Sequence, residues 1–266
     1  MFLALDIGNT NITFGLFSMK DKKKILPGPL KVWRMLTREK CTSDEYAIMF
    51  MNMLFYSGFD AKKVNNIAIS SVVPLLNGVF EELFKKYFDK EVFFVSCDNC
   101  GGLVFSEKNS KETGADRIAN VVAAYSFYNE GCIVIDFGTA TTFDCINCRG
   151  EYFGGAIVMG PLILMRLLNL ETSQLPNLGE IKKPSRSIGF NTFECMQSGI
   201  YFGYVGLAKE IITRMKKEIK IKHVIATGGF AELISDDIKE IEIVLPDLTL
   251  EGVRIIWEKS VKIDKD

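Results

Sequence analysis

The pattern of hydrophobic and polar positions divides the first hundred residues into three strands followed by alternating helices and strands. Alternating or continuous apolar runs predict the strands, and apolar residues at helical spacing predict the helices. A capping-box sequence, Thr42-Ser-Asp-Glu45, marks the start of the first helix. The predicted strands cover residues 2–5, 11–17, 30–36, 67–73 and 91–95, and the predicted helices cover about residues 42–56 and 74–88. This order describes one α/β unit.

The same order of elements recurs after residue 113, beyond a polar stretch with little periodicity. A helix is predicted from residue 114 to about residue 128, and an apolar strand, a tight turn and a second strand then repeat the pattern of the N-terminus. Further predicted strands cover residues 152–158 and 221–226, and helices cover residues 161–170, 191–218 and 230–234. An internal repeat of this size predicts two copies of one architecture, which we place in two domains, residues 1–113 and 114–266.

In each copy an aspartate ends the first strand and a glycine follows two residues later. The first copy reads DIGNT from Asp6, and the second reads DFGTATT from Asp136. A glycine lets a phosphate approach the backbone closely, the amide and hydroxyl groups behind it can donate to phosphate oxygens, and the aspartate can hold hydrated Mg²⁺ there. Either stretch alone would be an ordinary hairpin with a capping carboxylate. Two copies at matching places predict that both hairpins hold a nucleoside triphosphate across a cleft.

Composition narrows the class of protein further. The 266 residues are 48% apolar and 24% charged, with a net charge of −1, so no strong electrostatic field for nucleic acid or an anionic membrane is expected. The N-terminus lacks a basic region and reaches Asp6 too early for a signal peptide. The most apolar stretch, residues 157–170, is too short and too interrupted to span a bilayer. We expect a cytoplasmic protein without nucleic-acid or membrane partners.

The cysteines and the single histidine add two further questions. Seven cysteines, an odd number, indicate free thiols in a protein without an export signal. Cys97 with Cys100 and Cys145 with Cys148 have zinc-ligand spacing, although the long separation of the pairs favours an incidental arrangement. Whether these four thiols bind metal stays open at this stage. His223 is interpreted as a structural or surface residue.

The two hairpin motifs resemble the phosphate motifs of the superfamily that contains actin, sugar kinases, acetate kinase and the 70-kDa chaperones. The stretch ATGGFAEL at residues 226–233 resembles the glycine-rich adenosine motif of that superfamily. More narrowly, the motifs from about residue 3 to residue 252 are similar to type III pantothenate kinase: GADRIAN from Gly114, DFGTATTFD from Asp136, GGAI from Gly154, TSQLP from Thr172, and Asn191-Thr192 with Ser198-Gly199. This resemblance implies an α/β fold of duplicated ribonuclease H-like (actin-like ATPase) domains with a nucleotide cleft between them.

The resemblance also implies a reaction, the ATP-dependent phosphorylation of pantothenate to 4'-phosphopantothenate at the start of coenzyme A biosynthesis. Asp116 corresponds to the general base, and Asp136 corresponds to the ligand of a monovalent cation, K⁺ or NH₄⁺; Mg²⁺ accompanies ATP. Family members are typically homodimers whose pantothenate pocket is completed across the interface. The implied ATP-binding residues are Asp6, Ile7, Gly8, Asn9, Thr10, Asn11, Ile12, Thr13 and Thr139. The implied pantothenate-binding residues are Gly114, Ala115, Asp116, Arg117 and Thr192.

These implied roles agree with the chemistry of the side chains. Phosphoryl transfer needs positioning, charge neutralisation and a proton acceptor near the nucleophile, which a carboxylate such as Asp116 supplies. Arg117 can pair with the substrate carboxylate through its planar guanidinium group. An isolated Asp-Arg pair could instead be a helix-start carboxylate favoured by the helix dipole, with an exposed partner.

Two departures from the family pattern bear on the pocket. Many members carry Tyr-x-Asn-Pro shortly before the Gly-Ala-Asp-Arg segment, whereas this chain has Glu107-Lys-Asn109-Ser110. Met159 precedes Gly160 where members usually have proline. The first departure puts the substrate pocket wall in question.

Three other functions compete with the kinase. A non-catalytic homologue that acts as a regulatory accessory factor would fit a lost substrate, but retention of Asp6, Asp116 and Asp136 argues against it. A kinase or phosphatase for a sugar, acetate or polyphosphate would not explain the Gly-Ala-Asp-Arg segment. An actin-like filament protein would usually be longer.

Overall fold

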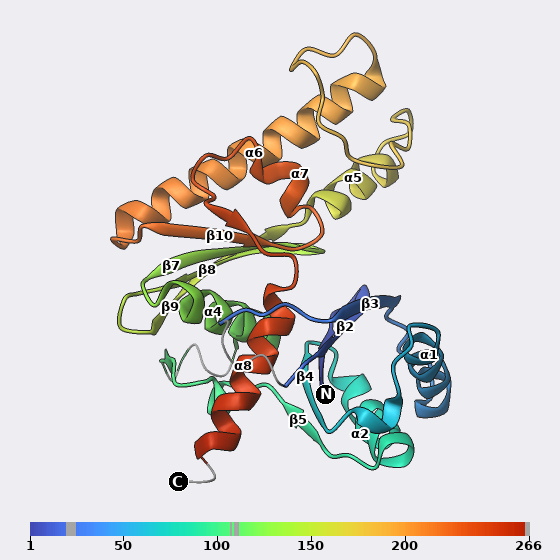
Figure 1. Ribbon diagram of the computed structural model, residues 1–266. Helices are drawn as coiled ribbons and strands as arrows, with labels where there is room; N and C mark the ends of the chain where they lie inside the picture. The colour runs from blue at the N-terminus through green and yellow to red at the C-terminus, as the bar shows by residue number, and fades with distance from the viewer. Residues whose placement is uncertain (20–24, 107, 109–111, 264–266) are drawn as a thin grey trace. The chain divides into compact units, whose positions relative to one another are not determined.

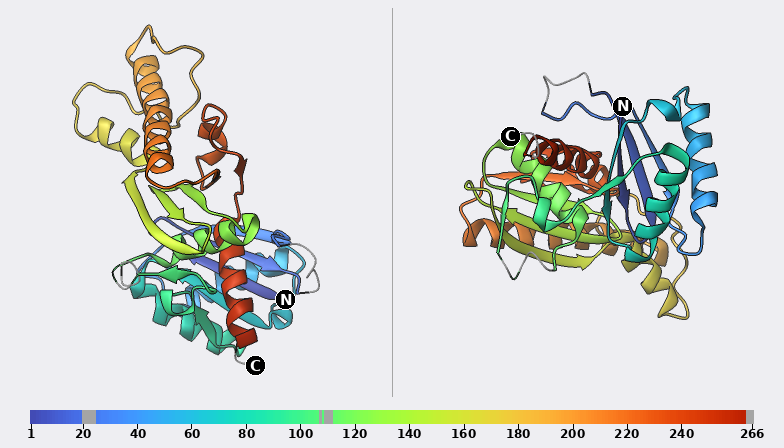
Figure 2. Two further views of the ribbon diagram at one scale, coloured as in Figure 1. Left: turned by 90° about the vertical axis from the view of Figure 1, so that its left-hand side faces the viewer. Right: turned by 90° about the horizontal axis from the view of Figure 1, so that it is seen from below.

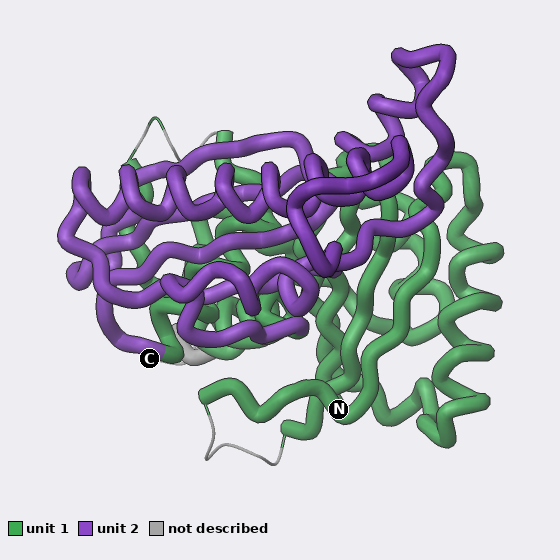
Figure 3. The backbone as a smooth tube through the Cα atoms, turned by 90° about the horizontal axis from the view of Figure 1, so that it is seen from above, with its two compact units in different colours: residues 1–127, 247–266 green, residues 128–246 purple. Residues whose placement is uncertain are grey.

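The computed structural model describes residues 1–19, 25–106, 108 and 112–263. Its contacts divide the chain into two compact units (Figure 3), residues 1–127 with 247–266 and residues 128–246. Glu107 and Ser110, which stand where many members of the resembled family have tyrosine and proline, lie outside the described residues. Each unit is described by itself below.

The first unit contains a mixed sheet with the strand order β3-β2-β1-β4-β5. Neighbours β1, β2 and β3 pair antiparallel, whereas β4 and β5 continue parallel to β1. The strands are β1 Phe2–Ile7, β2 Asn11–Phe17, β3 Lys31–Leu36, β4 Asn66–Ser71 and β5 Val92–Phe94. The helices are α1 Ser43–Tyr56, α2 Pro74–Phe88, α4 Ala115–Tyr128, which ends at the boundary of the unit, and α8 Leu248–Ile263. Short 3₁₀ turns lie at Ala61–Lys63 and Cys97–Asn99, and a two-residue strand, β6, lies at Val104–Phe105.

Helices cover both faces of this sheet (Figures 1 and 2): α1 and α2 pack on one face, and α8 packs against β1 and β4 on the other. The face toward α1 and α2 carries Leu3, Leu5 and Ile7 of β1, which are fully buried with the aromatic residues Phe50 and Phe80. The opposite face carries Phe2, whose ring lies 4.8 Å from the ring of Trp257 in α8. The alternation of strand side chains thus places an apolar layer on both sides of the sheet.

The second unit repeats this sheet with the order β9-β8-β7-β10-β11. Strands β7, β8 and β9 pair antiparallel, and β10 and β11 run parallel to β7. The strands are β7 Cys132–Phe137, β8 Ala140–Ile146, β9 Glu151–Met159, β10 His223–Thr227 and β11 Ile243–Val244. The helices are α5 Pro161–Leu170, α6 Thr192–Glu218 and α7 Ala231–Ser235. The shared strand order confirms the predicted duplication of a ribonuclease H-like unit.

The boundary of the compact units differs from the predicted division at residue 113. Nearly all of helix α4 and the C-terminal helix α8 fall in the first unit, and α8 contacts β1 and β4. Gly252 of α8 lies directly against the backbone of Ala119 in α4, which leaves no room for a Cβ. This close packing joins residues 247–266 to the N-terminal unit, although the repeat in the sequence begins at residue 114. Among the described residues, no helix combines the length and the apolar character needed to cross a membrane.

Candidate active site

The first aspartate hairpin joins β1 to β2. The Gly8 amide donates to the Asn11 carbonyl at 3.0 Å. Thr37, directly after β3, closes the turn from outside: its hydroxyl donates to the Gly8 carbonyl at 2.5 Å and its amide donates to the Thr10 carbonyl at 3.0 Å. Thr37 therefore fixes the conformation of the turn through two hydrogen bonds to its backbone.

The predicted ATP-binding stretch is not uniform in exposure. Asn9 is exposed, and most of its neighbours in the hairpin are half-buried. The side chains of Ile7 and Ile12 are fully buried in the apolar core beneath α1 and α2. These two residues can therefore meet a ligand only through backbone atoms.

A row of polar side chains crosses the first sheet at the level of Asp6. In the strand register Asp6 lies between Thr13 and Ser70, and Arg34 lies beyond Thr13. Ser70 Oγ donates to Asp6 Oδ1 at 3.0 Å, and Arg34 Nε donates to Thr13 Oγ1 at 3.4 Å. The nearby Asp247 carboxyl has a pKa raised by burial and lowered in part by the Arg34 charge. Sequence reasoning missed Arg34, Ser70 and Asp247, because strand pairing and the return of the chain bring them here.

Asp116 lies in the first turn of α4, at the same edge of the sheet as the Asp6 hairpin. The amide of Val72, directly after β4, donates to the Ile7 carbonyl at 3.0 Å. A Cβ on Gly114 would lie 3.3 Å from Val72 Cγ1 and 2.5 Å from Asp116 Oδ1, so a side chain there would displace the Asp116 carboxylate. The Arg117 amide donates to Asp116 Oδ1 at 2.8 Å. Both Asp116 and Arg117 are half-buried, which leaves them accessible to a ligand.

The second aspartate hairpin joins β7 to β8 and is surrounded by glycines. Gly228 follows β10 with φ +93°, and a Cβ there would collide with the Asp136 carboxylate and the Phe137 backbone. The Gly160 amide donates to the Thr139 carbonyl at 3.0 Å, and Gly160 packs against the turn too closely for a side chain. The glycine-rich stretch after β10 and the Asp136 hairpin are therefore adjacent parts of one site in the second unit.

Two threonines behind this hairpin have different surroundings. Thr141 is fully buried, and its hydroxyl accepts a hydrogen bond from Tyr204 at 2.6 Å. Thr142 pairs with Asp136 across β7 and β8, so both side chains lie on one face of the sheet. The Thr142 hydroxyl oxygen is buried and has no hydrogen-bond partner among the described residues. Thr139, the predicted ATP contact, is exposed.

Thr192, the predicted substrate contact of the second unit, is the first residue of α6 and is exposed. The preceding Asn191 caps the helix, because its side chain accepts from the Glu194 amide at 2.9 Å. A cavity of about 270 Å³ lies nearby, and none of the predicted site residues lines it. Its lining consists of Lys182, Lys183, Pro184, Ser185, Arg186, Gly189, Phe190, Phe193, Glu194 and Gln197.

The cysteine pairs do not form a metal centre in the part of the chain that the structure describes. No group of three or more histidine, cysteine or acidic side chains there could hold a metal ion. Burial raises the pKa of Cys97 to about 11 and that of Cys145 to about 12, so both side chains carry their protons at neutral pH. His223 contacts Glu242 at 2.8 Å and Glu130 at 3.1 Å through its two ring nitrogens, as a structural histidine would.

Comparison with solved structures identifies the fold. A protein from Campylobacter jejuni described as a Baf family transcriptional activator matches with a TM-score of 0.61 and 20% identity, over 98% of this chain and 99% of that chain. A ROK family glucokinase from Streptomyces griseus, solved with glucose and AMPPNP, matches with a TM-score of 0.56 and 13% identity, over 95% and 97% of the two chains. At this identity the likeness concerns the fold alone. The fold is that of the actin-like ATPases and sugar kinases.

Sequence comparison identifies the family. Residues 2–214 match the model of type III pantothenate kinase. A type III pantothenate kinase from Endomicrobium trichonymphae is 69% identical over 98% of this chain and 100% of that protein, and one from Geobacter sulfurreducens is 44% identical over 98% and 99%. The chain belongs to the type III pantothenate kinases. It catalyses the ATP-dependent phosphorylation of pantothenate in coenzyme A biosynthesis, with ATP and a divalent metal. The comparisons give no support for a non-catalytic regulatory role.

Proposed function

We propose that Asp116 is the general base of this kinase and that the two aspartate hairpins bind ATP. The ATP contacts are Asp6, Ile7, Gly8, Asn9, Thr10, Asn11, Ile12, Thr13 and Thr139. The pantothenate contacts are Gly114, Ala115, Asp116, Arg117 and Thr192. The observation that carries the proposal is the position of the first turn of α4, which Val72 connects to the end of β1.

The proposed chemistry follows from this position. The Asp116 carboxylate accepts the proton of the primary hydroxyl of pantothenate as the hydroxyl oxygen attacks the γ-phosphorus of ATP. The bond from the γ-phosphorus to the β–γ bridging oxygen breaks, and ADP leaves with the electron pair. The Arg117 guanidinium pairs with the carboxylate of pantothenate and orients the substrate. Amide and hydroxyl donors of the hairpins balance the negative charge of the phosphates.

We propose Mg²⁺ as the divalent metal of the first hairpin. The Asp6 carboxylate offers the hard oxygen ligand that Mg²⁺ prefers, and Ser70 orients it through one of its oxygens. Mg²⁺ usually keeps several waters and binds substrate phosphates, so one protein carboxylate is a sufficient anchor. When bound, the ion neutralises charge on the transferred phosphoryl group.

We propose that Asp136 binds a monovalent cation, K⁺ or NH₄⁺. The Thr142 oxygen, buried without a hydrogen-bond partner among the described residues, lies on the same face as the Asp136 carboxylate. An anionic and a neutral oxygen side by side suit a weakly hydrated cation. The bound cation would balance charge at the phosphate end of the site.

The remaining proposals concern the setting of the enzyme. We propose a cytoplasmic homodimer that has no nucleic-acid or membrane partner. The near-neutral charge supports the absence of such partners. Sedimentation analysis of the purified chain tests the dimer.

The decisive experiment measures ADP formation by the purified protein with Mg²⁺ and K⁺, with and without pantothenate. We expect pantothenate-dependent turnover that falls when Na⁺ replaces K⁺. Asp116→Asn should lower kcat by about 10²- to 10⁴-fold while ATP binding persists, because it removes only the proton acceptor. Asp136→Ala should lose the response to K⁺. An Asp116→Asn variant with the wild-type rate would remove Asp116 as the base.

A further inference from the structure

The buried side chain of Asn120 connects helix α4 to the start of α8. Asn120 lies one turn after Asp116, so both side chains emerge from the same face of α4. Its exposed fraction is 1%, and its Oδ1 accepts a hydrogen bond from Thr249 Oγ1 at 2.8 Å. A buried amide without its partners costs free energy. The contact therefore favours one position of α8 against the first turns of α4.

The backbone next to this hydrogen bond strengthens the connection. Gly252 follows Thr249 by three positions and so lies on the same face of α8. A Cβ on Gly252 would collide with the backbone of Ala119, the neighbour of Asn120. The two helices thus touch without an intervening side chain, and a shift of α8 would move α4.

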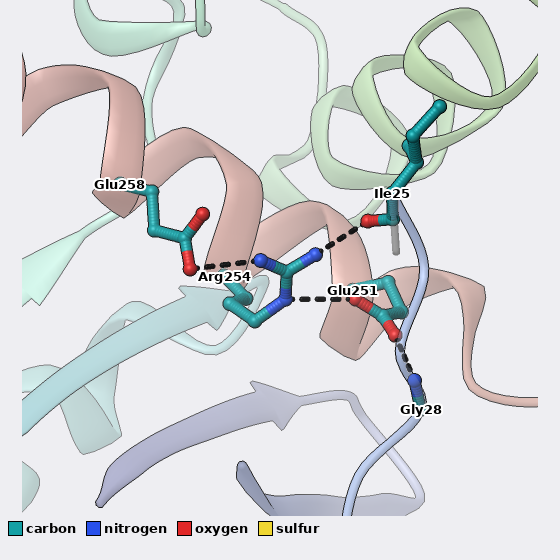
Figure 4. Close-up of polar contacts among 5 residues, drawn as sticks. All are labelled: Ile25, Gly28, Glu251, Arg254 and Glu258. Atoms are coloured by element: carbon teal, nitrogen blue, oxygen red, sulfur yellow. Dashed lines mark hydrogen bonds and ion pairs between the residues drawn. The ribbon is translucent and has the colours of Figure 1, made fainter. Parts of the chain in front are cut away.

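Helix α8 is itself anchored in the first unit by a buried ionic network (Figure 4). Arg254 donates to Glu251 at 2.9 Å, to Glu258 at 2.8 Å and to the carbonyl of Ile25 at 2.7 Å. Glu251 also accepts from the Gly28 amide at 2.6 Å. Because the Arg254 side chain is 7% exposed and the Glu251 side chain is 4% exposed, water competes little for these contacts. The network fixes the position of α8 in the first unit, and with it the position of the Thr249 hydroxyl that donates to Asn120.

We propose that Thr249 is a positioning residue that holds Asp116 in place through Asn120. The proposal rests on the proposed role of Asp116 as general base. Ala115 and residues 118–124 of α4 are buried, whereas Asp116 and Arg117 are half-buried. Burial therefore restrains these two side chains less than the following turn, which Asn120 connects to α8. A general base must lie within hydrogen-bond reach of its proton, and a misplacement of about 1 Å costs on the order of 10²-fold in rate.

The test compares Thr249→Val, which keeps the shape and removes the hydroxyl, with Thr249→Ser, which keeps the hydroxyl. We expect Thr249→Val to lower kcat with pantothenate by about 10- to 100-fold while the Kd for ATP stays within about twofold. Thr249→Ser should keep most of the rate. Amide hydrogen exchange at residues 115–118 should rise about tenfold or more in Thr249→Val, while exchange in α2 stays nearly unchanged and the Tm falls by only a few degrees, the cost of the buried Asn120 oxygen that loses this donor.

Two results would overturn the proposal. One is a Thr249→Val variant with wild-type kcat and wild-type exchange at residues 115–118. The other is a general loss of Tm, ATP binding and α2 protection, which would mark Thr249 as an ordinary stability residue. Asp116→Asn in the same series separates the two proposals. If Asp116→Asn keeps full turnover, Asp116 is not the general base. Thr249 then has no positioning role in catalysis, even where the exchange at residues 115–118 changes as expected.

Discussion

Gly228 shows how the absence of a single side chain shapes the second hairpin. Its φ of +93° is unfavourable for other residues, and a Cβ would collide with the Asp136 carboxylate. We predict that Gly228→Ala lowers the free energy of unfolding by about 1–3 kcal/mol. The substitution should also displace Asp136 and weaken the response of the kinase to K⁺. Urea unfolding followed by circular dichroism measures the first effect.

The neighbouring Gly229 provides a matched control. A Cβ on Gly229 meets no atom within 4 Å, and its φ is not in the left-handed region. Gly229→Ala should change the free energy of unfolding by no more than about 0.5 kcal/mol. Equal effects of the two substitutions would contradict the importance of the contact with Asp136.

Single residues of the candidate site differed in how well the sequence predicted them. Asp6 and Asp136 could be predicted because their hairpins repeat, and Asp116 because it lies in a recognisable motif. Arg34 and Ser70 could not be predicted, because a side chain in another strand joins the site only through the register of the sheet. A one-residue shift in that register would place the Arg34 or Ser70 side chain on the opposite face of the sheet.

Among the elements, the contact between α4 and α8 is the most sensitive to added volume. Gly252 lies against the Ala119 backbone, so a methyl group there must push the helices apart. We predict that Gly252→Ala lowers the free energy of unfolding by about 1–3 kcal/mol. It should also lower kcat more than it weakens ATP binding, because Asn120 and Asp116 move with α4.

A glycine in another helix gives the opposite expectation. Gly206 lies in α6, is exposed, and has no atom within 4 Å of an added Cβ. Gly206→Ala should therefore raise the free energy of unfolding by about 0.5–1 kcal/mol through helix propensity. Thermal unfolding of both variants measures the contrast, and a stabilised Gly252→Ala protein would refute the close packing.

Most helices and strands were predictable, because helix starts and the spacing of apolar residues are local features of the sequence. The predicted helix starts at Thr42, Pro74 and Pro161 agree with the structure, and both hydrogen bonds of the capping box at Thr42 are present. The sequence pattern did not predict α8, whose buried positions include Glu251 and Arg254. A buried ion pair interrupts the apolar period, and its partners Ile25 and Gly28 are more than two hundred residues distant. The strands β6 and β11 are too short to produce a pattern.

On the scale of the whole molecule, buried thiols make the stability of the folded chain depend on alkaline pH. Burial raises the pKa of Cys132 and of Cys145 from 9.0 to about 12. Below pH 9 both thiols keep their protons in the folded and unfolded chains, so their contribution is fully present. As the pH rises from 9 toward 12, the unfolded chain loses protons that the folded chain retains. The free energy of unfolding should then fall by about 1.4 kcal/mol per pH unit for each thiol.

Cys132→Ala tests this linkage. We expect the variant to be less stable at neutral pH because of its cavity, but to lose stability more slowly above about pH 9. The difference in slope should approach 1.4 kcal/mol per pH unit, as measured by urea unfolding at several pH values. Cys195→Ala removes an exposed thiol and serves as the control. Identical slopes for Cys132→Ala and the wild-type protein would contradict the raised pKa.

The discontinuity of the first unit has a consequence for synthesis on the ribosome. The helix that covers β1 and β4 is made only after the 119 residues of the second unit, residues 128–246. At about 5–20 residues per second, the nascent N-terminal unit waits roughly 6–24 s with the face around Phe2 uncovered. During this interval its apolar surface is open to chaperones and to wrong partners. A premature stop codon after residue 246 would leave it uncovered permanently and expose the product to proteolysis.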